Sequence, residues 1–78
     1  MIAKTLKLII TFHTTTEAMS MEACCRAEGA DGRLIPVPRS ISAGCGLAWC
    51  AAPQSEARLR ALMESRQIVF QDIHRCII

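Results

Sequence analysis

The sequence predicts an α+β fold in which two helices cover one face of a four-stranded antiparallel sheet. Three observations indicate it: short apolar runs with strand character, two longer segments with apolar residues at helical spacing, and turn residues between them. Their order is β-α-β-β-α-β, which is the ferredoxin-like sandwich arrangement. The 78 residues make a single domain, 1–78, without repeats, linkers or low-complexity segments.

The first part of the chain predicts a strand followed by a helix. Residues 5–12 are apolar and β-branched and form the strand. Thr14 and Glu17 match a capping box, so a helix begins here. Spacing of i, i+3 and i+7 predicts its buried face at Ala18, Met21 and Cys25. Gly29 and the turn at 30–32 end this helix.

Two short strands come next, joined by a loop. Residues 33–37 form the second strand, and Pro36 and Pro38 place it at an edge of the sheet or end it. Residues 39–44 contain Ser40, Ser42 and Gly44 and form the loop. The third strand follows directly at 46–51.

The last part of the chain predicts a second helix and a fourth strand. Pro53 interrupts the chain, and Ser55 is placed to cap a helix. The buried stripe of that helix is predicted at Leu59, Leu62 and Met63. The final strand begins at residue 68 and ends between residues 74 and 76, with Ile68 and Phe70 on one face.

Charge and aromatic content argue against a nucleic-acid-binding protein. Nine basic and seven acidic residues leave a formal net charge of +2, and the basic residues are scattered. A nucleic-acid surface needs clustered positive charge with stacking rings. The aromatic residues are Phe12, Trp49 and Phe70, and Trp49 on the third strand is predicted to pack against a helix or a second subunit.

Cysteine usage and the apolar runs predict a reducing, cytoplasmic setting. Five cysteines are an odd number, so they cannot all pair within the chain. The apolar run at 8–10 is too short for a signal peptide core or a membrane span. A chain this short has a marginal core, which a homodimer contact or a bound partner would strengthen.

Cys45 is the candidate reactive residue. It lies between a turn-rich loop and a strand, where a sulfur can be held still and reached from solvent. Gly44 and Gly46 leave the approach open, and we expect their backbone N–H groups to face the sulfur and stabilise negative charge. Arg39, six residues upstream, is a candidate for stabilising the thiolate, although a solvated loop arginine is the alternative.

Three further residues are candidates for supporting this thiol. Pro36 and Pro38 hold their segment extended and stiffen the loop before Cys45. Glu22 has Arg26 at i+4 as a ready salt-bridge partner, and the alternative is that it orients Arg39 or the cysteine loop.

The other four cysteines are predicted to be mainly structural. Cys50 lies five residues after Cys45, which is roughly 16 Å along a strand and too far for a disulfide, so it is expected to be a small buried side chain. Cys25 belongs to the helix core, Cys24 is partly exposed beside it, and Cys76 packs near the end of the chain. Whether Cys24, Cys50 or Cys76 assists Cys45 stays open.

Several motifs together resemble a known family of small bacterial proteins. The shared residues are Phe12, Thr14, Ala18, Met19, Glu22, residues 34–39 with the Pro-x-Pro-Arg segment, and residues 45–48 with the Cys-Gly pair. In these positions the chain resembles the selenium/sulfur carrier-like family, over nearly its whole length. The Cys24–Cys25 pair departs from that family's pattern.

The resemblance implies a carrier rather than a turnover enzyme. Cys45 would hold sulfur or selenium as a persulfide or selenide adduct, with no other cofactor. A cysteine desulfurase-type donor would supply the atom, and a selenium- or sulfur-using acceptor protein would receive it. Neither the identity of these partners nor the choice between sulfur and selenium follows from the sequence.

Two alternatives to a carrier remain open. One is a non-catalytic binding or regulatory module in which Cys45 is incidental, because ferredoxin-like domains serve many functions. The other is a soft-metal-binding protein that uses Cys45 and a second cysteine. The second alternative is weaker, because no Cys-x-x-Cys occurs and His13 and His74 are isolated.

Overall fold

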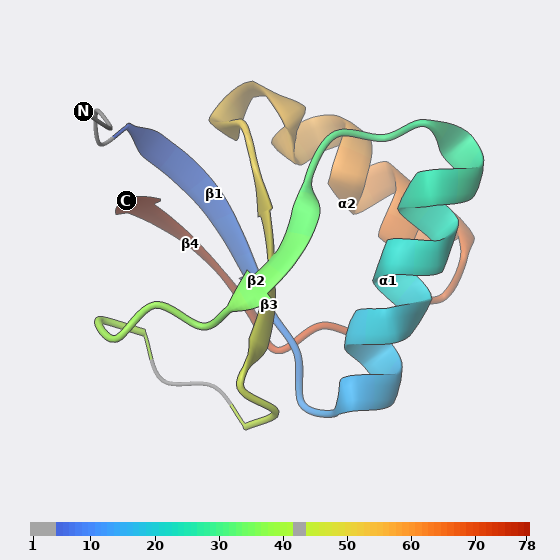
Figure 1. Cartoon of the computed structure of the whole chain (residues 1–78). Coiled ribbons are helices and arrows are strands. Elements are labelled where there is room, and N and C mark those ends of the chain that lie inside the picture. The colour runs from blue at the N-terminus through green and yellow to red at the C-terminus, as the bar shows by residue number, and fades with distance from the viewer. Residues whose placement is uncertain (1–4, 42–43) are drawn as a thin grey trace.

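A computed structural model describes residues 5–41 and 44–78 of the chain. Its helices and strands follow the predicted order (Figure 1). They are β1 (Leu6–Thr11), α1 (Thr15–Glu28), β2 (Arg33–Pro36), β3 (Leu47–Ala51), the 3₁₀ turn η1 (Pro53–Ser55), α2 (Glu56–Ser65) and β4 (Asp72–Ile77). The predicted loop at 39–44 includes residues 42 and 43, which lie outside the described part.

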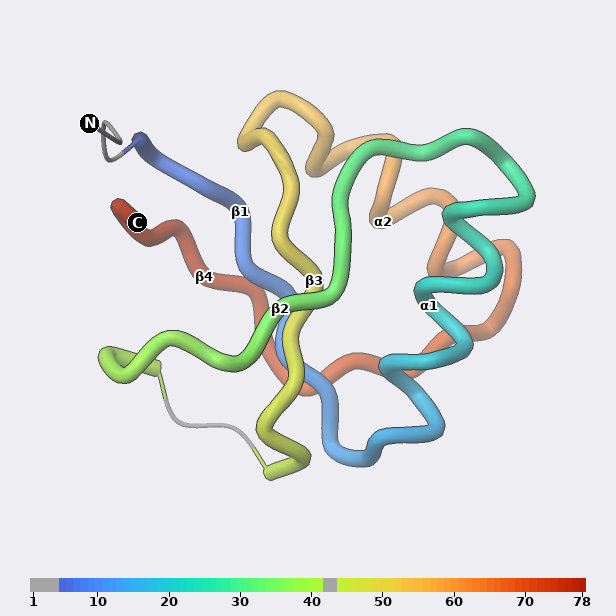
Figure 2. The backbone as a smooth tube through the Cα atoms, viewed as in Figure 1, coloured from blue at the N-terminus to red at the C-terminus, as the bar shows by residue number. Residues whose placement is uncertain are grey.

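The four strands form one antiparallel sheet in the order β2-β3-β1-β4. This is the ferredoxin-like order, so the predicted fold class is confirmed. Both helices lie on the same side of the sheet, and no helix of residues 5–41 and 44–78 covers the opposite side (Figures 1 and 2). No helix within the described residues is long and apolar enough to cross a bilayer.

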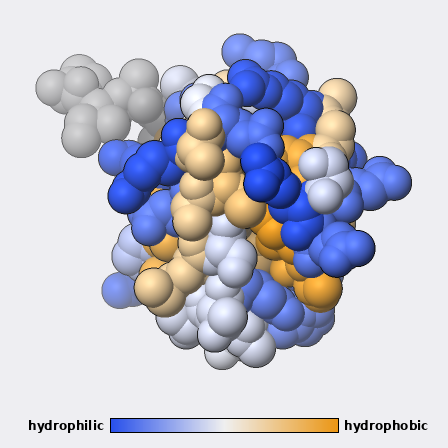
Figure 3. All heavy atoms as spheres, turned by 90° about the vertical axis from the view of Figure 1, so that its right-hand side faces the viewer, coloured by the Kyte–Doolittle hydropathy of each residue, from blue (hydrophilic) through white to orange (hydrophobic). Residues whose placement is uncertain are grey.

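The main core lies between the sheet and the helices. Leu8, Ile10 and Phe12 alternate along one face of β1 and its continuation, and all three are completely buried. The predicted helix positions pack against them: Ala18, Met21, Cys25, Leu59, Leu62 and Met63. Seen from the helix side, the outer surface is mostly hydrophilic with apolar strips between (Figure 3).

α1 begins and ends as its sequence predicts. The Thr14 hydroxyl accepts a hydrogen bond from the Glu17 N–H at 3.2 Å, which caps the helix start. The Glu17 carboxylate accepts from the N–H of His13, one residue before the cap, at 2.8 Å. Gly29 ends the helix with a left-handed φ of 67°, a conformation that glycine adopts without strain.

The start of the last strand was predicted wrongly. β4 begins at Asp72, not at residue 68. Thr11 is the last residue of β1 and pairs with Asp72, so the chain before Asp72 has no strand to pair with. Ile68 instead donates its N–H to the Met63 carbonyl at 2.8 Å, and Ile68 and Phe70 pack against the main core without being in a strand.

The predicted cap at Ser55 was also wrong in its side-chain role. Ser55 does precede α2, but its hydroxyl makes no capping bond. It donates instead to the Asp31 carboxylate at 3.1 Å. That carboxylate also accepts the Ala52 N–H at 2.9 Å, so Asp31 ties the turn before β2 to the end of β3. Pro53 begins the 3₁₀ turn η1, which connects the end of β3 to α2.

The helix-free face carries a second, smaller apolar cluster. Ile9, Ala48 and Cys50 are its buried members, and four partly buried residues pack against them: Ile35, Val37, Ile41 and Cys76. Val37 and Ile41 belong to residues 37–41, which follow β2 and lie on this side of the sheet (Figure 2). This segment reaches the far edge of the sheet, since Ser40 Oγ and Cys76 Sγ are 3.6 Å apart.

Candidate functional site around Cys45

Cys45 lies just before β3 and is held by the backbone of Leu47. The Leu47 N–H donates to Cys45 Sγ at 3.4 Å, and the thiol donates back to the Leu47 carbonyl at 3.5 Å. The side chain is partly buried and packs against the main core on the helix side. The sulfur is therefore fixed by two backbone contacts while part of its side chain stays accessible.

The pairing of the strands explains why Leu47 is free to hold a sulfur. Val37 donates to the Gly46 carbonyl at 3.0 Å, which makes the next pair, Pro36 with Leu47, a non-hydrogen-bonded pair. The N–H and C=O of Leu47 consequently point away from β2, toward β1. β1 ends at Thr11, opposite Ala48, so these groups lie beyond its last paired residue. Cys45 Sγ occupies the place of the missing strand partner.

Of the two backbone contacts, the Leu47 N–H is the one that can stabilise negative charge on the sulfur, because the carbonyl accepts only from the protonated thiol. The thiolate is the nucleophilic form of cysteine, and backbone N–H groups aimed at sulfur stabilise it. An N–H donor can equally stabilise the terminal charge on a persulfide held near the same place. The Leu47 N–H is thus the described group best placed to support chemistry at Cys45.

The two glycines beside Cys45 have different structural tasks. Gly46 has a φ of 78°, in the region that favours glycine, and its carbonyl receives the Val37 N–H. Gly44 was expected to direct its N–H at the sulfur. It donates instead to Gln71 Oε1 at 3.4 Å. The N–H that reaches the sulfur belongs to Leu47, which the sequence reasoning missed.

His13 and Gln71 also border the cysteine loop. A Cβ added at Gly44 would lie 3.3 Å from the His13 carbonyl oxygen, so the loop passes close to the end of β1. Gln71 binds both sides of this junction, because its side chain accepts from Gly44 and its N–H donates to the Thr11 carbonyl at 2.7 Å. No motif marks these two residues, because only the tertiary fold brings them to the loop.

Pro36 and Pro38 lie at the end of β2 and in the connection that follows it. Pro36 ends the edge strand β2 at a non-hydrogen-bonded position, so its missing N–H would face away from the sheet and costs no ladder bond. The Pro38 carbonyl accepts the Ile41 N–H at 2.9 Å, which closes a turn in the connection. The prediction that these prolines place the second strand at an edge of the sheet or end it is confirmed, because β2 is an edge strand and Pro36 is its last residue.

Arg39 and Glu22 are not brought to Cys45 by any described contact. Arg39 is exposed and makes no hydrogen bond or salt bridge within residues 5–41 and 44–78, so its thiolate-stabilising role stays a prediction. Glu22 pairs with Arg26 at 3.8 Å on the exposed side of α1, as the spacing predicts. The alternative role of Glu22, orienting Arg39 or the loop, has no described contact to support it.

All five cysteines are free thiols, in distinct settings. Cys25 is 1% exposed, and burial, reinforced by the neighbouring Cys24, raises the pKa of its thiol to about 11. Cys50 is buried in the cluster on the helix-free face, whereas Cys45 packs on the helix side. Cys45 and Cys50 are therefore not a redox pair, as their spacing predicts. Cys24 and Cys76 are partly buried.

The described residues offer no built metal centre. Across 5–41 and 44–78, no three His, Cys, Asp or Glu side chains come together as a metal site would require. His13 instead lies near Glu17, with Nδ1 and Oε1 3.4 Å apart, and His74 lies 3.9 Å from Asp72. The soft-metal alternative thus gains no support from the geometry.

Comparison with protein families identifies the chain. Residues 7–75 match the model of a family described as "Putative Se/S carrier protein-like". The match includes the whole segment from Pro36 to Leu47, and with it Cys45. No curated protein and no solved structure matches the chain significantly. Because the family model spans most of its length, the chain belongs to the Se/S carrier protein-like family.

Proposed function

We propose that the protein carries sulfur or selenium as a covalent adduct on Cys45. The observation that supports this most directly is the position of Cys45 Sγ, partly accessible and within 3.4 Å of the Leu47 N–H. A carrier needs a thiol that reacts readily and then holds its cargo in one place. Membership of the Se/S carrier protein-like family points to the same function.

The loading step is a thiol–persulfide exchange. The Cys45 thiolate attacks the outer sulfur of a donor persulfide, R–S–SH. A new bond forms between Cys45 Sγ and that sulfur, the S–S bond of the donor breaks, and the donor leaves as a thiolate. The outer sulfur keeps its proton, so atoms and electrons balance without an added oxidant. A donor carrying selenium in the outer position would react in the same way.

The surroundings of Cys45 suit both loading and release. The Leu47 N–H would stabilise the thiolate before attack and the charged persulfide after it. Gly44 and Gly46 add no side chains beside the sulfur, which leaves room for the active cysteine of a second protein. Arg39 is the candidate cation for the same loop, and its contribution would appear as slower loading in Arg39→Gln.

A carrier of this kind works between two proteins. We propose a cysteine desulfurase-type donor, which forms a persulfide, and an acceptor that uses sulfur or selenium. The free state of all five cysteines fits a reducing, cytoplasmic setting. The protein would be used once per atom transferred and would not turn over a small substrate itself.

The test is intact-mass spectrometry after incubation with a desulfurase and free cysteine. Wild type should gain the mass of one sulfur atom, and a reductant should remove it. Cys45→Ser should gain none, whereas the matched control Cys50→Ser should gain as much as wild type. Equal loading of Cys45→Ser and wild type would show that Cys45 is not the carrier residue.

A further inference from the structure

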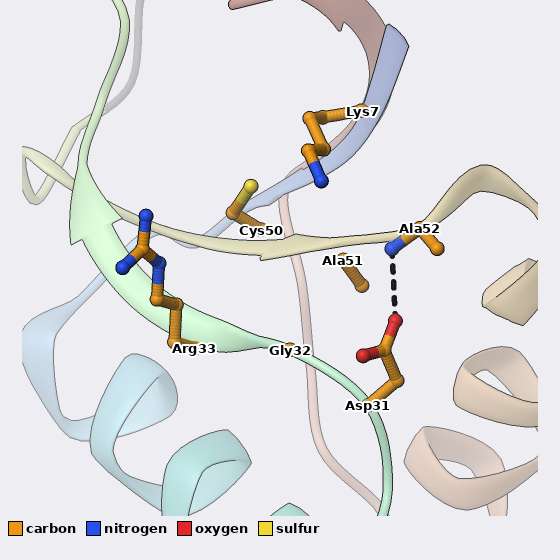
Figure 4. A pocket seen from close by; sticks show the side chains of 7 residues that line it. All are labelled: Lys7, Asp31, Gly32, Arg33, Cys50, Ala51 and Ala52. Atoms are coloured by element: carbon orange, nitrogen blue, oxygen red, sulfur yellow. Dashed lines mark hydrogen bonds between the residues drawn. The ribbon is translucent and has the colours of Figure 1, made fainter. Parts of the chain in front are cut away.

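A pocket lies at the end of the sheet where β3 ends and β2 begins, away from Cys45. It has a volume of about 310 Å³, near the lower limit for small-molecule sites. Its lining comes from the ends of β1, β2 and β3: Lys7, Asp31, Gly32, Arg33, Cys50, Ala51 and Ala52 (Figure 4). We name it the Lys7–Arg33 pocket.

Strand register places two cations on either side of Cys50 in this pocket. Arg33 on β2 is the direct cross-strand partner of Cys50. On the other side, Ile9 of β1 pairs with Cys50, and Lys7 lies two residues before it on the same face. Direct partners lie about 5 Å apart at Cβ and diagonal ones about 7–8 Å, so both side chains can reach the space above the thiol. In Figure 4 all three side chains project from the same side of the strands.

Neither cation pairs with an acidic side chain in the part of the chain that the structure describes. Lys7 and Arg33 make no salt bridge or side-chain hydrogen bond within the described residues. Asp31 is the acidic residue of the lining, and it is already engaged. Its carboxylate accepts the Ala52 N–H at 2.9 Å and the Ser55 hydroxyl at 3.1 Å, on the other side of β3 from Cys50 (Figure 4). The lining therefore carries two cations above a floor of small side chains, and one carboxylate that keeps its charge but is held by neutral donors on the other side of β3.

We propose that the Lys7–Arg33 pocket binds a tetrahedral oxyanion, either free or as the head group of a small molecule. The guanidinium of Arg33 can bind two oxygens of one anion with its planar pair of N–H groups. The ammonium of Lys7, coming from the opposite strand, supplies a point charge for a third oxygen. Three such contacts suit sulfate or phosphate better than a carboxylate, which has only two oxygens. Small residues at Gly32, Cys50 and Ala52 leave room for the anion.

The test is an NMR titration of the full chain with sodium sulfate at constant ionic strength. Saturable shifts are expected at the backbone amides of Gly32, Cys50 and Ala52. Arg33→Gln and Lys7→Gln should each weaken binding about tenfold. Arg26→Gln is the matched control, because it removes the same charge from the exposed side of α1 and should bind as wild type.

Further titrations and variants define the class of ligand and test whether binding at this pocket is independent of Cys45. Acetate should bind more weakly than sulfate, and glycerol 3-phosphate compared with inorganic phosphate distinguishes a head group from a free ion. Arg33→Lys keeps the charge and should retain measurable binding, which guards against a folding defect in Arg33→Gln. Cys45→Ser should bind as wild type. The proposal is overturned if shifts grow linearly with sulfate, if acetate binds as tightly, or if Arg26→Gln weakens binding equally.

Discussion

Cys45 and Cys50 are five residues apart, yet the fold gives them opposite surroundings. Cys45 packs on the helix side, beyond the end of β1, where its sulfur takes two backbone contacts from Leu47. Cys50 lies within the sheet on the helix-free face, with strand partners on both sides. Backbone groups are thus free to contact a thiol where the strand ladder ends, and they are engaged between strands where the ladder continues.

The largest expected difference in packing is between Gly32, which lies against the backbone of Cys50, and Gly44, which precedes Cys45. A Cβ at Gly32 would overlap the Trp49 side chain and lie 2.8 Å from the Cys50 carbonyl oxygen, at a φ of 120°. Gly32→Ala should therefore lower the free energy of unfolding by roughly 3 kcal/mol or more. Gly44→Ala meets only the His13 carbonyl, at 3.3 Å, and should cost less than about 1 kcal/mol.

Urea denaturation of both glycine variants measures this difference. Trp49 fluorescence can follow unfolding, since the ring is buried and its Nε1 donates to the Asp31 carbonyl at 3.0 Å. Equal losses in Gly32→Ala and Gly44→Ala would mean that the region around Cys50 is no more tightly packed than the region around Cys45.

Alkylation should rank the thiols by environment. The pKa of the Cys25 thiol, raised by burial from 9.0 to about 11, leaves it about a hundredfold less thiolate near neutral pH than an ordinary thiol. Cys45 should therefore react with iodoacetamide at least ~100-fold faster than Cys25, with the 8% exposed Cys50 between them. Peptide mass mapping at timed intervals gives each rate.

The pH dependence adds a check on the alkylation order. The rate at Cys25 should rise about tenfold per pH unit and level off only near pH 11, because the thiolate is the reacting form. If Cys50 or Cys25 is modified before Cys45 in the folded protein, the contrast between the two ends of β3 does not govern reactivity.

A smaller contrast is expected at the backbone that positions the Cys45 sulfur. Gly46 has a φ of 78° with no atom within 4 Å of an added Cβ, so Gly46→Ala introduces backbone strain alone, about 1–2 kcal/mol. Gly29→Ala is a matched control with a φ of 67° and equally open space, far along the chain at the end of α1. Both should lose similar stability in urea, but only Gly46→Ala should slow alkylation of Cys45. Equal slowing in both variants would contradict a role for Gly46 in positioning the thiol.

Local signals in the sequence were sufficient for most of the fold. The capping box at Thr14, the left-handed glycine after α1 and the buried stripes of both helices depend on residues within a few positions of each other. The errors occurred where distant segments decided the outcome. β4 begins at Asp72 because β1 ends at Thr11, and Ser55 turns its hydroxyl to Asp31 instead of capping α2.

By itself, the sequence determined the order of the elements, the edge position of Pro36 and the selection of Cys45 as the loop thiol. The tertiary structure decided what surrounds that thiol: the Leu47 backbone beyond the end of β1, and Gln71 against Gly44. It also decided that Cys50 lies on the opposite face beside Lys7 and Arg33. The physical reason is that Gln71, Lys7 and Arg33 lie on segments distant in sequence from the cysteines they surround. Leu47 is only two residues from Cys45, but its N–H and C=O are left for the sulfur because β1 ends opposite Ala48.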